Sequence, residues 1–280
     1  SAHLAEVAPR AAQHIVDTVY FGGGTPSYLG PKRLKALLSS VQKHYVLSKD
    51  ADITLEANPD SAGDWRALRT LRRAGFNRIS LGMQSSIEGE LRAVGRIHTF
   101  EQVRAAVDAA RKAKFKNVSL DLIYGLPEQT MESFSASLRA AVALEPEHIS
   151  CYGLKLEEGT PLYTARNTFS AADDDLQADM YLFAVSFLQE AGFAQYEISN
   201  FARPGFESRH NLKYWTLSEY AGFGPGAHSD FGGVRYSFDR DLDAYINGAL
   251  RGGQMPMECE DLPAWTRDTE YLMLTLRTVR

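Results

Sequence analysis

The sequence contains only two cysteines, Cys151 and Cys259, among 280 residues. They lie far apart, so no disulfide framework is expected, and a reducing cytoplasm is the expected location. No apolar run approaches the roughly 20 residues that cross a bilayer, which limits any membrane contact to a peripheral one. The first residues also lack the basic and apolar regions of a secretory signal. The net charge is -5 with Lys and Arg scattered along the chain, which argues against a nucleic-acid surface.

What the sequence does contain is a regular alternation of short strands and helices. Strands are predicted near residues 17–21, 52–56, 78–82, 117–123 and 148–153, and helices are predicted from Gly30 and over 64–74, 100–114 and 131–144. The period is roughly thirty residues, the size of a βαβ unit, which predicts parallel strands joined by helical crossovers.

Within these strands, apolar and polar residues alternate. One face carries Val19/Phe21, Ile53/Leu55, Ile79/Leu81, Val118/Leu120/Leu122 and Ile149/Cys151, and the other carries Thr18/Tyr20, Thr54/Glu56, Ser80/Gly82/Gln84, Ser119/Asp121 and Ser150/Tyr152. A doubly wound sheet is covered on both faces and would be apolar on both. The pattern therefore favours an open or partial (β/α) barrel with helices outside and a polar interior that holds a ligand.

Three glycines, Gly22 to Gly24, interrupt the first strand pattern and precede Thr25-Pro26. Glycines are costly to order, so they indicate either a tight turn or a close approach of the backbone to a bound molecule. Glu56, Gln84, Asp121 and Tyr152 also lie near carboxyl ends of predicted strands, where such barrels place their sites. Each side chain alone has a structural explanation, but their convergence on one rim favours a binding site.

After residue 155 the pattern changes, and we divide the chain into a barrel core, 1–155, and an extension, 156–280, that closes the barrel. The extension is expected to hold a helix over 171–191, a strand over 195–199, a loop-rich stretch over 200–236, a short helix at Tyr245 and an apolar helix or strand over 270–279. The candidate residues of the loop-rich stretch are His210, Tyr214, Trp215 and His228. They suit stacking of a flat ligand or ligation of its iron, or equally the packing that closes the barrel.

Several motifs together carry a resemblance to a known family: FGGGTPSYL, ITLEANPD, RISLGMQS, GRIHT, SLDLIYGLPEQT, HISCYGLKLEEGTPLY, YEISNFARPG, RHNLKYW and YAGFGPGAHS. They resemble the radical S-adenosylmethionine (radical SAM) family, in its branch related to oxygen-independent coproporphyrinogen III oxidase and nearest to the HemW-type heme chaperones. The resemblance implies an α/β fold, a partial (β/α)6 barrel, here without its first strand and with a loop-rich α+β extension.

The resemblance also implies roles for particular residues. Gly23, Gly24 and Thr25 would meet the amino end of the methionine part of S-adenosylmethionine (SAM), and Arg96 would pair with its carboxylate. The ribose hydroxyls and neighbouring polar atoms would be bound by Glu56, Gln84 and Asp121. Heme or porphyrin would be the second ligand, with His210, Tyr214, Trp215 and His228 as candidate contacts and heme-acceptor proteins as partners.

One departure from the family is large. The family holds a [4Fe-4S] cluster on three cysteines at C-x3-C-x2-C spacing, and no such triplet occurs here. The resemblance places that motif, and the first strand, before Ser1, and it places a further region after residue 280, so we expect this chain to be the middle of a longer protein. The 280 residues are then expected to bind SAM weakly, to support no radical chemistry, and to expose a strand edge beside residues 17–21 that encourages self-association.

Three functions remain open. The first is heme binding and trafficking on a radical SAM fold. The second is oxidative decarboxylation of coproporphyrinogen III. The third, outside the family, is a barrel enzyme that binds an anionic metabolite at the glycine loop. No catalytic residue and no metal-ligand set is assigned, and the oligomeric state is left open.

Overall fold

The computed structural model describes residues 2–252 and 254–278, and it divides into two compact units. Unit 1 comprises Ser1–Val19, Lys35–Asp52 and Ser208–Arg280, and unit 2 comprises Tyr20–Leu34 and Ile53–Glu207. Both units are discontinuous in sequence, because the boundary passes through the first two strands. The functional division at residue 155 stays a prediction.

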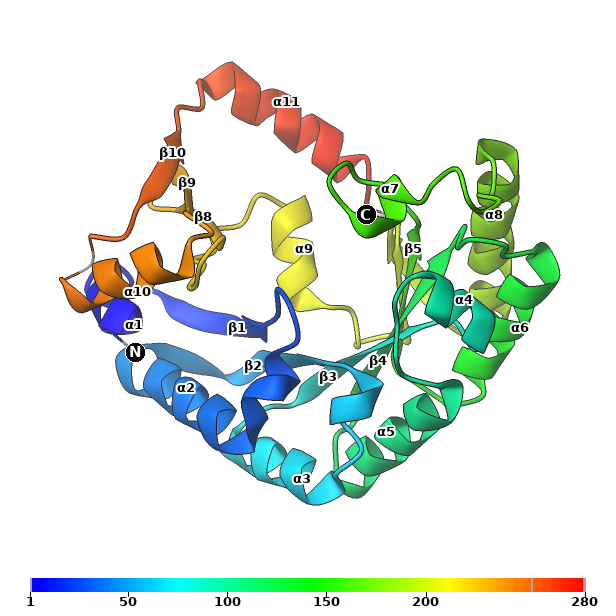
Figure 1. Cartoon of the computed structure of the whole chain (residues 1–280). Coiled ribbons are helices and arrows are strands. Elements are labelled where there is room, and N and C mark those ends of the chain that lie inside the picture. Colours follow the sequence, from blue (N-terminus) through cyan, green and yellow to red (C-terminus); the bar gives the residue numbers. More distant parts are fainter. Residues whose placement is uncertain (1, 253, 279–280) are drawn as a thin grey trace. The chain divides into compact units, whose positions relative to one another are not determined.

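A seven-stranded sheet runs in the order β1-β2-β3-β4-β5-β7-β6. Its strands are β1 (Ile15–Phe21), β2 (Val46–Ala57), β3 (Arg78–Gln84), β4 (Asn117–Tyr124), β5 (His148–Gly153), β6 (Ala194–Glu197) and β7 (Asn200–Ala202). Strands β2 to β5 pair in parallel, and β7 and β6 continue the sheet antiparallel. This is the expected α/β fold of a curved, open parallel sheet (Figure 1).

The helices of unit 2 follow the strands in the expected alternation. They are α3 (Trp65–Ala74), α4 (Glu88–Ala93), α5 (Phe100–Lys112), α6 (Met131–Val142), α7 (Pro161–Thr164) and α8 (Asp174–Glu190), with the 3-10 turns η1 (Pro26–Leu29) and η2 (Pro59–Ser61). Thr99 and Thr130 begin α5 and α6 with capping boxes. Helix α5 packs on β3, and α6 and α8 pack on β4 (Figure 1).

The alternation of side chains in strands β2 to β5 is confirmed. The apolar members of the pattern in these strands are at most 6% exposed. On the opposite face, the parallel register places Glu56 beside Ser80 and Ser80 beside Ser119, and one layer further along it places Gly82, Asp121 and Ser150 side by side. The polar residues of four strands therefore form continuous rows across one side of the sheet.

Unit 1 contains most of α2 (Gly30–His44), and α1 (Ala2–Val7), α9 (Arg209–Trp215), α10 (Leu242–Leu250) and α11 (Ala264–Thr275). It also contains a three-stranded antiparallel sheet, β10-β9-β8, of β8 (His228–Phe231), β9 (Val234–Phe238) and β10 (Met257–Glu260). The stretch 200–236 is thus more ordered than its glycines suggested, because Ser208 caps α9 and β8 finds a partner in β9. Val279 and Arg280 lie outside the described residues.

Candidate functional site

The three glycines after β1 serve different purposes. A Cβ on Gly22 would lie 2.4 Å from Tyr20 Cε1 and 2.8 Å from Glu56 Cδ, so these side chains would have to shift to admit one there. Gly23 and Gly24 have φ values of 81° and 149°, and nothing lies within 4 Å of the position of a Cβ on either. These two glycines therefore present their backbone to open space in conformations that disfavour other residues.

Glu56, at the end of β2, is fixed through both of its carboxylate oxygens. The Tyr20 hydroxyl donates a hydrogen bond to Oε1, and the Gly23 N–H donates to Oε2 at 3.3 Å. Burial raises the pKa of Glu56, and these two hydrogen bonds act in the opposite direction. The Glu56 carboxylate thereby connects the glycine loop to β2 and is held in one position.

Thr25 is tied to the segment that follows Glu56. Its Oγ1 accepts a hydrogen bond from Asn58 Nδ2 at 3.2 Å, and the hydroxyl of Tyr28 donates to Asp60 Oδ2 at 2.6 Å. Asn58 was not among the predicted site residues. The signal that could have found it is its position two residues after Glu56, on the same face of the extended chain.

Gln84 reaches the site through a distortion of β3. Its φ is 63°, and the register with β4 shifts between Gly82 and Gln84. The Gln84 amide nitrogen lies 2.8 Å from the position that a Cβ on Gly82 would occupy, so the side chain folds back over the glycine. This bulge places the amide on the polar face of the sheet.

Asp121 on β4 belongs to the same polar face. Ser80 Oγ lies 3.1 Å from both of its carboxylate oxygens. Burial is the main reason that the pKa of Asp121 is raised to about 6, with a hydrogen bond from Ser150 opposing it and the charge of Glu56 adding to it. Burial and the charge of Asp121 also raise the pKa of the neighbouring Tyr152 to about 12.

Arg96 follows α4, and in the described residues it takes no part in the hydrogen bonds of this group. In the described part of the chain it forms no ion pair, and it is half-buried. Its charge helps to lower the pKa of His98, although burial of that imidazole is the larger cause. His98 Nε2 lies 3.3 Å from the carbonyl oxygen of Met83, one residue before Gln84.

The candidate heme residues lie in unit 1, three of them on α9. Lys213 Nζ forms an ion pair with Asp17 Oδ1 at 2.8 Å and fixes the helix. His210 Nδ1 lies 2.9 Å from Thr18 Oγ1, and Nε2 lies 3.0 Å from the Tyr214 hydroxyl. Burial lowers the pKa of His210 to about 4, so this imidazole is neutral near pH 7 with both nitrogens hydrogen-bonded.

The remaining heme candidates are partly accessible. Tyr214 makes an edge contact with Tyr220, with ring centroids 4.8 Å apart, and Arg277 lies 5.6 Å from the Trp215 ring. His228 is exposed at the start of β8. Over residues 2–252 and 254–278, His, Cys, Asp and Glu side chains form no group of three that could hold a metal ion.

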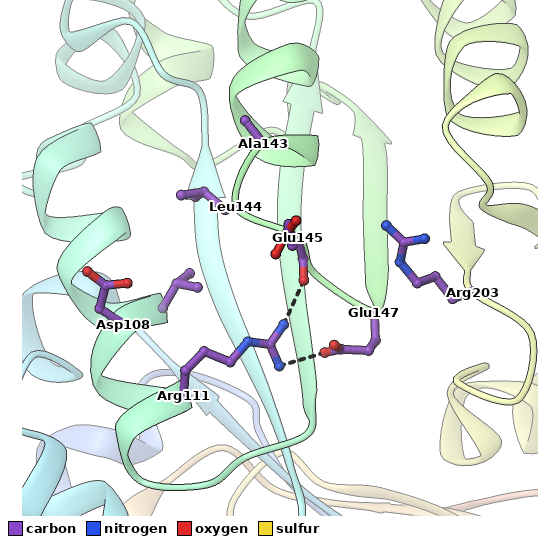
Figure 2. Close-up of a pocket in the computed structure, with 8 residues that line it drawn as sticks. Asp108, Arg111, Ala143, Leu144, Glu145, Glu147 and Arg203 are labelled. Carbon is purple, nitrogen blue, oxygen red and sulfur yellow. Dashed lines mark hydrogen bonds and ion pairs between the residues drawn. The ribbon is translucent and has the colours of Figure 1, made fainter.

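A cavity of about 610 Å³ lies in unit 2, away from all of these residues. It is lined by the second half of α5, the segment between α6 and β5, and Arg203 (Figure 2). Arg111 Nη1 and Glu147 Oε2 are 2.9 Å apart, and Arg111 Nη2 donates to the Glu145 carbonyl oxygen at 2.7 Å. Because Arg111 and Glu147 are bonded to each other and to the backbone, we interpret this cavity as structural.

Comparison with known proteins adds independent information. The model of the Radical SAM superfamily matches residues 2–141. The heme chaperone HemW of Mycobacterium tuberculosis (strain CDC 1551 / Oshkosh) is 41% identical over 99% of this chain and 71% of its own length. The heme chaperone HemW of Bacillus subtilis (strain 168) is 38% identical over 96% of this chain and 71% of its own length.

Among solved structures, coproporphyrinogen III oxidase from Escherichia coli, a radical SAM enzyme, superimposes with a TM-score of 0.83. The match covers 99% of this chain and 67% of that one at 24% identity, which supports the fold alone. In the described residues no helix is long and apolar enough to cross a membrane.

Proposed function

Since this chain belongs to the radical SAM superfamily, and within it to the family of the HemW heme chaperones, we propose that it binds SAM in unit 2 and carries heme for delivery to acceptor proteins. The observation that carries the proposal is the likeness to two proteins named heme chaperone over at least 96% of the chain. A cytoplasmic location is part of the same proposal.

The polar face of unit 2 fits SAM chemically. SAM carries an ammonium group, a carboxylate, a sulfonium and ribose hydroxyls, so its site needs both acceptors and a cation. Glu56 and Asp121 supply acceptors, Gln84 supplies an amide, and Arg96 supplies a guanidinium without an ion pair in the described residues. Gly23 and Gly24 leave room for the ligand to approach the backbone.

The iron–sulfur cluster of the family does not fit these 280 residues. The chain has two cysteines, Cys151 is buried in unit 2, and Cys259 is exposed in unit 1. We therefore assign no cluster to these residues. SAM binding is proposed as weak, because the methionine group lacks the iron that chelates it in the family.

Calorimetric titration with SAM tests the first half of the proposal. Glu56→Gln is expected to weaken SAM binding by about tenfold, because it removes a charged acceptor. Glu190→Gln is the matched control, since Glu190 is exposed at the end of α8. Equal affinities in the two variants would contradict the placement of SAM on this face, and tight binding by the 280-residue chain would contradict the proposed weak affinity.

Heme titration tests the second half. His210→Ala is expected to remove the spectrum of histidine-bound heme, whereas His44→Ala, at the end of α2 in the same unit, is expected to leave it unchanged. Tyr214→Phe removes a hydroxyl that competes with iron for Nε2 of His210, so it is expected to strengthen heme binding. An unchanged spectrum in His210→Ala would remove this residue as a ligand, and a loss of binding in Tyr214→Phe would point to Tyr214 instead.

Conversion of coproporphyrinogen III to protoporphyrinogen separates the chaperone from the oxidase. We expect no product from the chain alone. Product at catalytic rates would overturn the proposal in favour of oxidative decarboxylation.

A further inference from the structure

Tyr20 connects the glycine loop to Glu56, and the backbone around it is adapted to its ring. Strands β1 and β2 are neighbours in the sheet, and the Tyr20 hydroxyl crosses from one to the other to reach Glu56 Oε1. On the way its ring covers Gly22, where a Cβ would lie 2.4 Å from Tyr20 Cε1. The first glycine of the loop therefore leaves room for the Tyr20 ring and the Glu56 carboxylate.

The consequence for Glu56 is that each carboxylate oxygen has its own donor. Tyr20 holds Oε1, and the Gly23 N–H holds Oε2 at 3.3 Å. An ionised carboxylate offers about four lone-pair positions, so acceptor capacity is left for a ligand. Holding both oxygens also restricts the torsions of a flexible side chain before any ligand binds, which lowers the entropy cost of binding.

We propose that Tyr20 is a positioning residue of the SAM site, which fixes the Glu56 carboxylate so that its remaining lone pairs accept hydrogen bonds from the ligand's donor groups. This inference rests on the proposed function. Tyr20 keeps 37% of its surface exposed.

The electrostatics of the group make the role measurable. Burial raises the pKa of Glu56. Two hydrogen bonds lower it, and the bond from Tyr20 has the larger effect. The titratable and charged groups facing the pair are Asp121 from β4, Tyr152 from β5 and, through Asp121, Arg78 from β3. Loss of the Tyr20 hydroxyl is therefore expected to raise the pKa of Glu56 further.

The first experiment needs no SAM. The side-chain carboxyl of Glu56 is titrated by NMR in the ligand-free chain, as wild type and as Tyr20→Phe. The pKa of Glu56 is expected to rise in the variant. Tyr163→Phe is the matched control, because the Tyr163 hydroxyl donates to Glu158 Oε1 at 3.0 Å in another part of unit 2. This control variant is expected to leave the pKa of Glu56 unchanged. An unchanged pKa of Glu56 in Tyr20→Phe would overturn the proposal.

The second experiment measures SAM affinity by calorimetry across pH. Tyr20→Phe is expected to weaken SAM binding by about fivefold, the effect of one hydrogen bond, and to move the acidic loss of binding to higher pH. In a Glu56→Gln background the same substitution is expected to change affinity less than twofold, since it acts through the carboxylate. Equal losses in both backgrounds would overturn the positioning role. If wild type binds no SAM, the proposed function fails while the NMR titration still decides the role of Tyr20.

Discussion

At the scale of single residues, Asp121 shows how the proposed SAM site and the stability of the fold place opposite demands on one side chain. Its pKa is raised to about 6, mainly by burial, whereas the value in an unfolded chain is about 3.8. Between these two values the folded state binds more protons than the unfolded state. The stability therefore decreases as the pH rises through this range, and the full cost of the charged carboxylate is present above pH 6.

Asp121→Asn removes that cost, because a neutral amide still accepts from Ser80. At pH 7.5 the variant is expected to be more stable by on the order of 1–3 kcal/mol, and at pH 3.5 the difference is expected to vanish. Urea unfolding at the two pH values measures this. Asp108→Asn, an exposed position on α5, is the control. Lower stability of Asp121→Asn at pH 7.5 would contradict the conclusion that burial of the charged Asp121 carboxylate destabilises the fold. An unchanged SAM affinity of the variant would contradict the proposed role of Asp121 in SAM binding.

Gly22→Ala measures the steric cost of a side chain at the first position of the glycine loop. The added methyl group would overlap the Tyr20 ring and the Glu56 carboxyl group, so the substitution is expected to cost about 1–3 kcal/mol of unfolding free energy. Gly63→Ala is a fitting control, since nothing lies within 4 Å of its Cβ position and it has no positive φ. Urea unfolding of both variants measures the effect. Equal stabilities would show that the Tyr20 ring moves aside freely.

At the scale of secondary-structure elements, much of the site could be predicted, because the alternation of a strand is local. It placed Glu56, Ser80 and Asp121 on one face, and the pairing of β2 to β4 then brought them together. The position of Gln84 over Gly82 depends on a bulge with φ of 63°, which the alternation does not contain. The contact of Tyr20 with Glu56 depends on which strands are neighbours, and such long-range pairing is not visible in a single sequence.

The attachment of α11 to the small sheet of unit 1 also depends on such long-range contacts. Asp230 on β8 is 6% exposed, and its carboxylate accepts from Arg235 on β9 and from Arg267 on α11. Asp230→Ala leaves two arginines without this partner and is expected to cost about 3 kcal/mol.

Hydrogen exchange locates that loss. Exchange is expected to accelerate in α11 and β9 of Asp230→Ala, while exposed Asp268→Ala, on the outer side of the same helix, is expected to change little. Unchanged protection of α11 in Asp230→Ala would mean that the ion pair between Arg235 and Glu270 suffices to hold it.

At the scale of the whole molecule, the strand pairing of the seven-stranded sheet determines which truncated fragments can fold. Strands β6 and β7 and helix α8 all follow residue 155, yet β7 pairs with β5 through Ala202, Phe201 and Asn200. Helix α8 buries Met180, Ala184 and Leu188. A fragment of residues 1–155 would therefore expose the edge of β5 and the apolar surface that α8 covers.

Fragments test this directly. Residues 1–207 retain all seven strands and every predicted SAM residue, so this fragment is expected to fold and to keep SAM affinity within about threefold of the 280-residue chain. Residues 1–155 are expected to aggregate, because an unpaired central strand offers a template for intermolecular pairing. Light scattering, circular dichroism and calorimetry distinguish the outcomes. A 1–155 fragment that is soluble and binds SAM would support the division at residue 155. If 1–155 aggregates while 1–207 binds SAM, the SAM-binding part of the chain ends after β7.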